Sequence, residues 1–137
     1  SNQPLWLSLT LEDDLNNPSV SNLRSSESLE STLSEIDFNL VDAILFNCSQ
    51  PEVMEAAVRK TSNFCNESIS IGVYANAFPA INSEQKEANN QLRDLRSDLT
   101  PTGYLAFARK WQKAGANIIG GCCGIGPEHI KELKKLK

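Results

Sequence analysis

The chain has 137 residues, 40% of them hydrophobic, so it can bury one core but is short for two domains. Its formal net charge of −4 argues against nucleic acid as a partner, because such binding depends on clustered lysine and arginine. No apolar run approaches the ~20 residues of a membrane span, and no basic segment followed by an apolar run opens the chain. We therefore expect a cytoplasmic protein without a membrane partner.

Short apolar runs alternate with segments of helical pattern four times along the chain, which is typical of βα units and a parallel sheet. The first predicted strand covers residues 5–11, and a long polar loop follows over residues 12–24. A helix is then predicted to begin near Ser25 or Ser26. The apolar face of this helix comprises Leu29, Leu33 and Ile36.

The second predicted strand covers residues 43–48, an unbroken apolar run that suits burial on both faces. Ser49 and Glu52 have the spacing of a capping box, and Pro51 falls in the first turn, so a helix is expected at once. Its core positions are Val53, Met54, Ala57 and Val58. This abrupt change from strand to helix places Cys48 at the carboxyl end of the strand.

The third predicted strand covers residues 69–76. A polar stretch follows over residues 82–98, much of which we expect to be a mobile loop. Thr100 as N-cap and Pro101 as the first helical residue then begin a helix, which Gly115 ends as the C-cap. The core positions of this helix are Phe107, Trp111 and Ala114.

The last unit combines a strand over residues 117–122, a tight turn over residues 123–126 and a helix from Pro127. The core positions of this helix are Ile130, Leu133 and Leu136. In parallel α/β folds, ligands bind at the carboxyl ends of the strands. The cysteines that end the second and fourth strands are therefore expected on one functional face.

These cysteines, Cys48, Cys122 and Cys123, have the chemistry of a zinc site. A disulfide between the adjacent Cys122 and Cys123 would be strained, because neighbouring Cα atoms lie only ~3.8 Å apart. Thiols of a cytoplasmic protein also normally stay reduced. Three thiolates with an open fourth position suit a catalytic zinc, and the C-x-x-C pairs of a zinc finger are absent. The alternative is that these are three small core residues.

Three further residues near these elements have candidate roles. Glycines around the cysteine pair let the backbone approach a ligand closely, which makes Gly121 a substrate-binding candidate. Cys65 falls in a polar segment, residues 62–67, and is predicted to be a surface thiol. His129, the only histidine, is predicted to have a structural role in the first turn of the last helix.

Several motifs resemble those of the homocysteine S-methyltransferase family. The most specific is GANIIGGCCG at residues 115–124, with Pro127, His129 and Ile130 after it, which resembles the family's C-terminal signature. Asn47-Cys48 followed by Pro51-Glu52 is similar to the family's upstream cysteine motif, VYAN at residues 73–76 resembles its Tyr-Pro-Asn segment, and Trp6-Leu7-Ser8 resembles the preceding strand. The resemblance keeps the family's order and spans nearly the whole chain.

The resemblance implies a (β/α)8 TIM barrel, with residues 1–137 as its zinc-binding C-terminal half. It also implies that Cys48, Cys122 and Cys123 hold zinc, that homocysteine's sulfur becomes a further ligand, and that its methylation gives methionine. S-methylmethionine or S-adenosylmethionine is favoured as the methyl donor over betaine or a methylfolate. No catalytic residue beyond the zinc site is predicted.

Two residues near the end of the third strand are candidates for substrate binding by the same resemblance. Asn76 matches the family's asparagine, whose carbonyl can lie near the metal or the substrate. Tyr74 could line the same pocket, although residues two apart on a strand could equally be one face of barrel packing.

A sheet of four units leaves two edges and an apolar face uncovered, which favours self-association or pairing with an N-terminal half-barrel. The chain is then part of a longer enzyme, a subunit of a two-chain barrel, or a free-standing open-sheet domain. The alternative function is a non-catalytic zinc-binding or assembly module, inactive without the N-terminal half-barrel. A fourth protein ligand on the metal would distinguish that module from a catalytic site.

Overall fold

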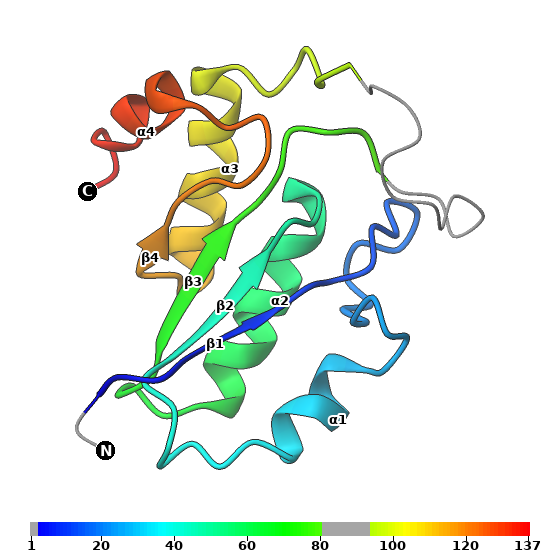
Figure 1. Cartoon of the computed structure of the whole chain (residues 1–137), viewed down its shortest axis with the longest axis vertical. Coiled ribbons are helices and arrows are strands. Elements are labelled where there is room, and N and C mark those ends of the chain that lie inside the picture. Colours follow the sequence, from blue (N-terminus) through cyan, green and yellow to red (C-terminus); the bar gives the residue numbers. More distant parts are fainter. Residues whose placement is uncertain (1–2, 81–93) are drawn as a thin grey trace.

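A computed structural model describes residues 3–80 and 94–137, which form a parallel sheet with helices after its strands (Figure 1). The strand order is β1-β2-β3-β4, so each strand pairs with its neighbour in sequence. The strands are β1 (Trp6–Leu9), β2 (Ala43–Asn47), β3 (Ser70–Tyr74) and β4 (Ile118–Ile119). The helices are α1 (Leu29–Ser34), α2 (Pro51–Phe64), α3 (Pro101–Ala114) and α4 (Pro127–Leu133). The predicted α/β class with repeated parallel units is confirmed.

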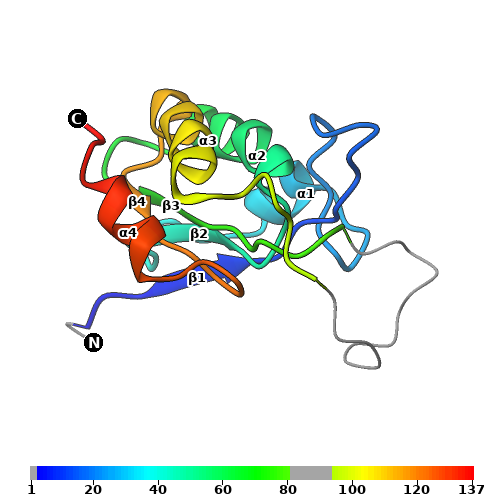
Figure 2. The same cartoon turned by 90° about the horizontal axis from the view of Figure 1, so that it is seen from above.

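The core lies between the sheet and the helices on one of its faces. Figure 2 shows α2 and α3 on the same side of the sheet. Ile44 and Phe46 of β2 are fully buried there, in one cluster with Trp111 of α3. Side chains alternate between faces along a strand, so Trp6 of β1, which is 57% exposed, points to the opposite face. In the predicted barrel, that second face is the one that the remaining strands would enclose.

The predicted ends of α3 are confirmed. The hydroxyl of Thr100 accepts a hydrogen bond from the backbone N–H of Gly103 at 3.1 Å, and Pro101 follows as the first helical residue. Gly115 ends the helix with a φ of 128°, a conformation that strongly favours glycine. Trp111 is fully buried as predicted, which anchors α3 on the sheet.

The first helix begins later than predicted. Residue 26 is not helical, because Ser26 has a φ of 76° and its N–H closes a turn onto the carbonyl of Leu23. The N-cap is instead Ser28, whose hydroxyl accepts from the N–H of Ser31 at 3.1 Å. Of the three predicted core positions, Leu29 and Leu33 are fully buried, and Ile36 lies beyond the end of the helix and is partly buried.

The capping box predicted at Ser49 and Glu52 is wrong. The N-cap of α2 is Gln50, and no side chain caps the helix there. The hydroxyl of Ser49 instead accepts from the N–H of Leu11 at 2.9 Å, across the top of the sheet. Tertiary partners have therefore replaced the local pair, although Pro51 begins the helix as predicted.

The last unit differs most from its prediction. Regular pairing in β4 covers only two residues, but the N–H of Gly120 donates to the carbonyl of Val73 at 2.9 Å, so the chain continues beside β3. In α4, Leu133 is buried as predicted, whereas Ile130 is 46% exposed. Most of the loop predicted over residues 82–98 lies outside the described residues.

Cys65 is not a plain surface thiol. Helix α2 extends to Phe64, so Cys65 is the C-cap of this helix rather than a loop residue. Its side chain packs partly against the core, and this burial raises the pKa of the thiol. Among residues 3–80 and 94–137, no helix is long and apolar enough to cross a bilayer.

Candidate metal centre

Three cysteine side chains converge at the carboxyl edge of the sheet. Cys48 follows β2, and Cys122 and Cys123 lie in the loop after β4. The Cα atoms of Cys48 and Cys122 lie 5.7 Å apart and their sulfurs form a disulfide, while the sulfurs of Cys122 and Cys123 lie 3.9 Å apart. The structure thus brings together the three predicted ligands, but it pairs two of them where reduced thiols were expected.

Reduction of this disulfide would leave three free thiols whose spacing suits zinc. In a tetrahedral site with Zn–S bonds of ~2.3 Å, sulfur ligands lie ~3.8 Å apart, close to the 3.9 Å between Cys122 and Cys123. Cys48 is near enough to join them, because its Cα lies 5.7 Å from that of Cys122. While the disulfide is intact, no three His, Cys, Asp or Glu side chains in the described parts of the chain are arranged to hold a metal ion.

Cys48 sits on a constrained turn. Its φ is 49°, in the left-handed region that residues with a side chain rarely adopt. Its N–H donates to the carbonyl of Tyr74 at 3.1 Å. Its own carbonyl accepts from the side-chain amide of Asn76 at 2.9 Å and from the guanidinium of Arg24 at 3.1 Å. Such a conformation persists when its surroundings over-determine it, as these three bonds do.

The two substrate-binding candidates of the third unit have partners within the protein. Asn76 is 7% exposed, and its side-chain oxygen accepts from the N–H of Phe78 and from Gln50, both at 3.1 Å. The hydroxyl of Tyr74 is hydrogen-bonded to that of Ser8 at 2.7 Å, on the sheet face opposite α2 and α3. Asn76 therefore contacts Cys48 from inside the protein, whereas Tyr74 lies on the open face.

Glycines allow the cysteine loop after β4 to pack tightly. A Cβ atom on Gly121 would overlap the side chain of Ile125, so this position has no room for a side chain. Gly124 has a φ of 78°, and a Cβ there would lie 2.9 Å from that of Ala77. The N–H of Ala77 in turn donates to the carbonyl of Cys123 at 2.9 Å. Close packing within the chain thus accounts for Gly121, the third substrate-binding candidate.

Two side chains from the helices hold the same loop. The hydroxyl of the buried Tyr104 donates to the carbonyl of Gly120 at 2.7 Å, and burial raises the pKa of this phenol, so it remains a donor. The N–H of Gly126 donates to Nδ1 of His129 at 3.2 Å. The ring proton therefore lies on Nε2, which contacts the carbonyl of Leu99 at 2.7 Å. The predicted structural role of His129 is confirmed.

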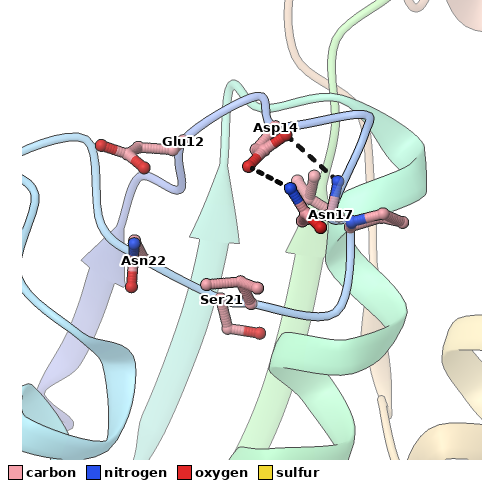
Figure 3. A pocket seen from close by; sticks show the side chains of 8 residues that line it. Glu12, Asp14, Asn17, Ser21 and Asn22 are labelled. Carbon is pink, nitrogen blue, oxygen red and sulfur yellow. Dashed lines mark hydrogen bonds between the residues drawn. The ribbon is translucent and has the colours of Figure 1, made fainter.

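A separate shallow pocket lies in the loop between β1 and α1 (Figure 3). Asp14 shapes this loop, because its carboxylate accepts from the backbone N–H groups of Asn16 and Asn17, both at 3.1 Å. The pocket is lined by Glu12, Asp14, Asn17, Pro18, Val20, Ser21, Asn22 and Val53. None of the three converging cysteines belongs to it.

Nearly the whole chain matches a known family. The sequence model of the family described as homocysteine S-methyltransferase matches residues 1–136. The chain belongs to the homocysteine S-methyltransferase family.

Individual relatives of this family agree at moderate identity. The chain is 29% identical to homocysteine S-methyltransferase 1 of Brassica oleracea var. italica, over 96% of the chain and 37% of that protein. It is 28% identical to homocysteine S-methyltransferase YbgG of Bacillus subtilis (strain 168), over 93% of the chain and 36% of that protein. A selenocysteine Se-methyltransferase of Brassica oleracea var. italica is 24% identical over 96% of the chain and 35% of its own length.

The fold has a match among solved structures. The homocysteine methyltransferase MmuM from Escherichia coli, in its oxidised form, superimposes with a TM-score of 0.67 at 24% identity, over 98% of this chain and 36% of that one. The chain thus spans about a third of the length of its relatives. An open parallel sheet of four strands is consistent with part of a barrel.

Sequence reasoning missed the polar residues that support Cys48 in this family member. Gln50 is fully buried, and Arg96 forms ion pairs with Glu52 at 2.6 Å and with Asp98 at 2.7 Å. Hydrogen bonds to Glu52 and Asp98 raise the pKa of the guanidinium, and its bonds to Asp98 lower the pKa of that carboxyl. Their signal in the sequence is weak, because Arg96 lies in a polar stretch far from Gln50 along the chain.

Proposed function

We propose that the chain is the zinc-binding part of a methyltransferase that methylates the thiol of homocysteine, with Cys48, Cys122 and Cys123 as the zinc ligands. The observation that carries the proposal is the convergence of these sulfurs at the carboxyl edge of the sheet, where parallel α/β folds bind ligands. Membership of the homocysteine S-methyltransferase family supports the acceptor.

The chemistry requires a thiolate. A free thiol has a pKa of ~8.5 and is mostly protonated at neutral pH, whereas the thiolate is the nucleophile. Zinc, when bound, keeps a coordinated thiol deprotonated. The transfer forms a bond between the methyl carbon and the sulfur of homocysteine and breaks the bond from that carbon to the donor's sulfonium sulfur. Methionine and a neutral thioether result when the donor is S-methylmethionine or S-adenosylmethionine, the donors we propose.

The protein's own residues place and shield this site. The bonds to its carbonyl fix the backbone of Cys48, and the packing of Gly121 against Ile125 fixes the loop of the cysteine pair. We propose that Tyr74 and Gly121 border the acceptor, and that Asn76 contributes through the backbone of Cys48. Reduced thiols are required throughout, which a cytoplasmic location would maintain.

Covering of the open sheet face is part of the proposal. Trp6 is 57% exposed on β1, and the hydroxyls of Ser8 and Tyr74 meet on the same face at 2.7 Å. Contiguous apolar surface on one face of a sheet is a common site of contact with another element. We propose that an N-terminal half-barrel, or a second copy of the chain, packs there and completes the site.

X-ray absorption at the zinc edge tests the proposal. The reduced, zinc-loaded chain would be measured with and without homocysteine. We expect three sulfurs and one light atom, changing to four sulfurs when homocysteine is added. A chain that takes up no stoichiometric zinc would contradict the proposal. A closed site with a fourth protein ligand, indifferent to homocysteine, would instead favour the non-catalytic assembly module.

A further inference from the structure

The turn that carries Cys48 rests on a series of linked hydrogen bonds, here called the Gln50 network, that runs from Cys48 through Asn76 and Gln50 to Arg96. The carbonyl of Cys48 accepts from Nδ2 of Asn76 at 2.9 Å, and Oδ1 of Asn76 accepts from Nε2 of Gln50 at 3.1 Å. Nε2 of Gln50 also donates to the carbonyl of Phe78 at 2.6 Å. Gln50 is fully buried and Asn76 is 7% exposed, so the bond between the two amides forms away from water, while the bonds to the two carbonyls are partly buried.

Only one orientation of the side-chain amides of Asn76 and Gln50 satisfies all of these hydrogen bonds. The N–H of Phe78 can only donate, at 3.1 Å, so the Asn76 atom that faces it must be the oxygen, and the nitrogen must face Cys48. The carbonyl of Phe78 can only accept, so Gln50 presents its nitrogen there and its oxygen to Arg96 at 2.7 Å. Arg96 has only donors, and it completes the alignment.

Arg96 is itself held in place. Its guanidinium donates to both carboxylate oxygens of Glu52, at 2.6 and 2.9 Å, and to both of Asp98, at 2.7 and 3.0 Å. Its backbone N–H donates to the carbonyl of Ala77 at 2.8 Å. The segment before α3 is therefore tied to the first turn of α2, and the acceptor oxygen of Gln50 has a fixed partner.

A second set of contacts reaches the carbonyl of Cys48 from the β1–α1 loop. The guanidinium of Arg24 donates to the carbonyl of Cys48 at 3.1 Å and lies 3.7 Å from the carboxylate of Asp13. That carboxylate also accepts from the backbone N–H of Gln50 at 2.9 Å. Gln50 thus takes part in both sets: its backbone N–H bonds to Asp13, and its side chain bonds to Asn76.

From this geometry we infer that Gln50 is a positioning residue for Cys48: it orients Asn76, and Asn76 holds the Cys48 turn in the conformation that aims its sulfur at Cys122 and Cys123. The inference rests on the proposed function of these cysteines as metal ligands. Mutation of residues that hydrogen-bond to a metal ligand commonly lowers metal affinity, although these residues do not contact the metal. Gln50 lies one step further back, because it acts through Asn76.

The test compares zinc affinity in Gln50→Met and in a matched control, Thr61→Val. Methionine fills similar volume but removes both amide groups. Thr61 is also fully buried on α2, where its hydroxyl donates to the carbonyl of Ala57 at 2.8 Å, a bond outside the Gln50 network. Zinc Kd would be measured by chelator competition on the reduced full chain, and stability by urea unfolding.

We expect Gln50→Met to weaken zinc binding roughly 10-fold or more, with altered thiolate charge-transfer bands when Co²⁺ replaces zinc. Thr61→Val should lose stability while its Kd and cobalt spectrum stay at wild-type values. Gln50→Glu sharpens the test, because it keeps an acceptor for Arg96 but cannot donate to Asn76. It should weaken binding as Gln50→Met does.

A wild-type Kd in both Gln50 variants would overturn the positioning role. If Gln50→Met does not fold, Arg96→Met at the partly exposed end of the network replaces it, with the same expected weakening and the same overturning result. Wild-type protein that binds no zinc would instead overturn the proposed function, and the inference with it, so the two failures are distinguishable.

Discussion

The two ends of the candidate metal centre are held by different means. At the end of β2, side chains hold the backbone of Cys48: its carbonyl has two side-chain donors, from Asn76 and Arg24. At the end of β4, the cysteines' own backbone groups bond to other backbone groups, while the side chains of Tyr104 and His129 hold the neighbouring Gly120 and Gly126. The N–H of Cys122 donates to the carbonyl of Ala75 at 2.9 Å, and Gly121 packs on Ile125.

This difference predicts that changes near Cys48 alter mainly zinc affinity, whereas changes in the loop of Cys122 and Cys123 alter mainly the stability of the fold. The side-chain donors to Cys48 take no part in the hydrogen bonds between strands, so their loss should affect the metal more than the fold. The loop of Cys122 and Cys123 packs against the core through Tyr104 and Ile125. Changes there should alter stability first.

The largest effect is expected when the ligand chemistry itself is removed. Zinc uptake should require a reductant, because the disulfide leaves only Cys65 and Cys123 as free thiols. Full reduction should raise the number of titrated thiols from two to four per chain.

Cys48→Ser should abolish stoichiometric zinc binding, measured by metal analysis after dialysis. Cys65→Ser is the control and should bind as wild type. Full zinc occupancy in Cys48→Ser would remove this residue from the ligand set.

Crowding the β4 end should give the next largest effect. Gly121→Val places a branched side chain where even a Cβ overlaps Ile125, which should destabilise the fold by about 2 kcal/mol or more. Urea unfolding measures the loss. Adding Ile125→Ala to the same variant should recover part of the stability by making room. A Gly121→Val protein as stable as wild type would show that the loop repacks freely.

Loss of one buried hydrogen bond at this end should have a smaller effect. Tyr104→Phe removes the donor at 2.7 Å from the carbonyl of Gly120 and should cost about 1–2 kcal/mol, because a partly buried acceptor is left unpaired. Tyr74→Phe is the matched control, since its hydroxyl bond to Ser8 is exposed. Equal unfolding free energies for wild type and Tyr104→Phe would argue against a structural role of the hydroxyl.

The smallest effect concerns the ion pair at the far end of the Gln50 network. Arg96 lowers the pKa of Asp98, so the stabilisation is present above the unfolded pKa, ~3.9, and is lost as pH falls through the lower folded value. Because Asp98 is largely exposed, the contribution should stay within about 1 kcal/mol. Unfolding free energies measured between pH 6 and pH 3 for wild type and Asp98→Asn should converge at the acid end. A constant difference across this range would exclude the linkage.

Local patterns in the sequence were sufficient for the units that depend on neighbouring residues. The N-cap Thr100, the C-cap Gly115 and the alternation of four strands with helices all follow from contacts a few residues apart. The convergence of the three cysteines also follows from the sequence, because all strands of a parallel sheet have their carboxyl ends on the same edge. The family motifs indicated the same arrangement.

The predictions failed where a distant partner competed with a local one. The hydroxyl of Ser49 bonds to the backbone of Leu11 instead of capping its own helix, and Glu52 pairs with Arg96, 44 residues away in sequence. The exposure of Ile130 has a similar origin, because only the docking of α4 on α3 decides which helix face is covered.

The sequence by itself therefore determined the order of the elements, the parallel sheet and the edge on which the three cysteines lie. Only the tertiary structure decided which atoms hold those cysteines: the amides of Gln50 and Asn76, the guanidinium groups of Arg24 and Arg96, and the hydroxyl of Tyr104. The physical reason is that element order depends on propensity and hydrophobic period, which are local, whereas a buried polar group accepts whichever partner the packed chain brings within reach.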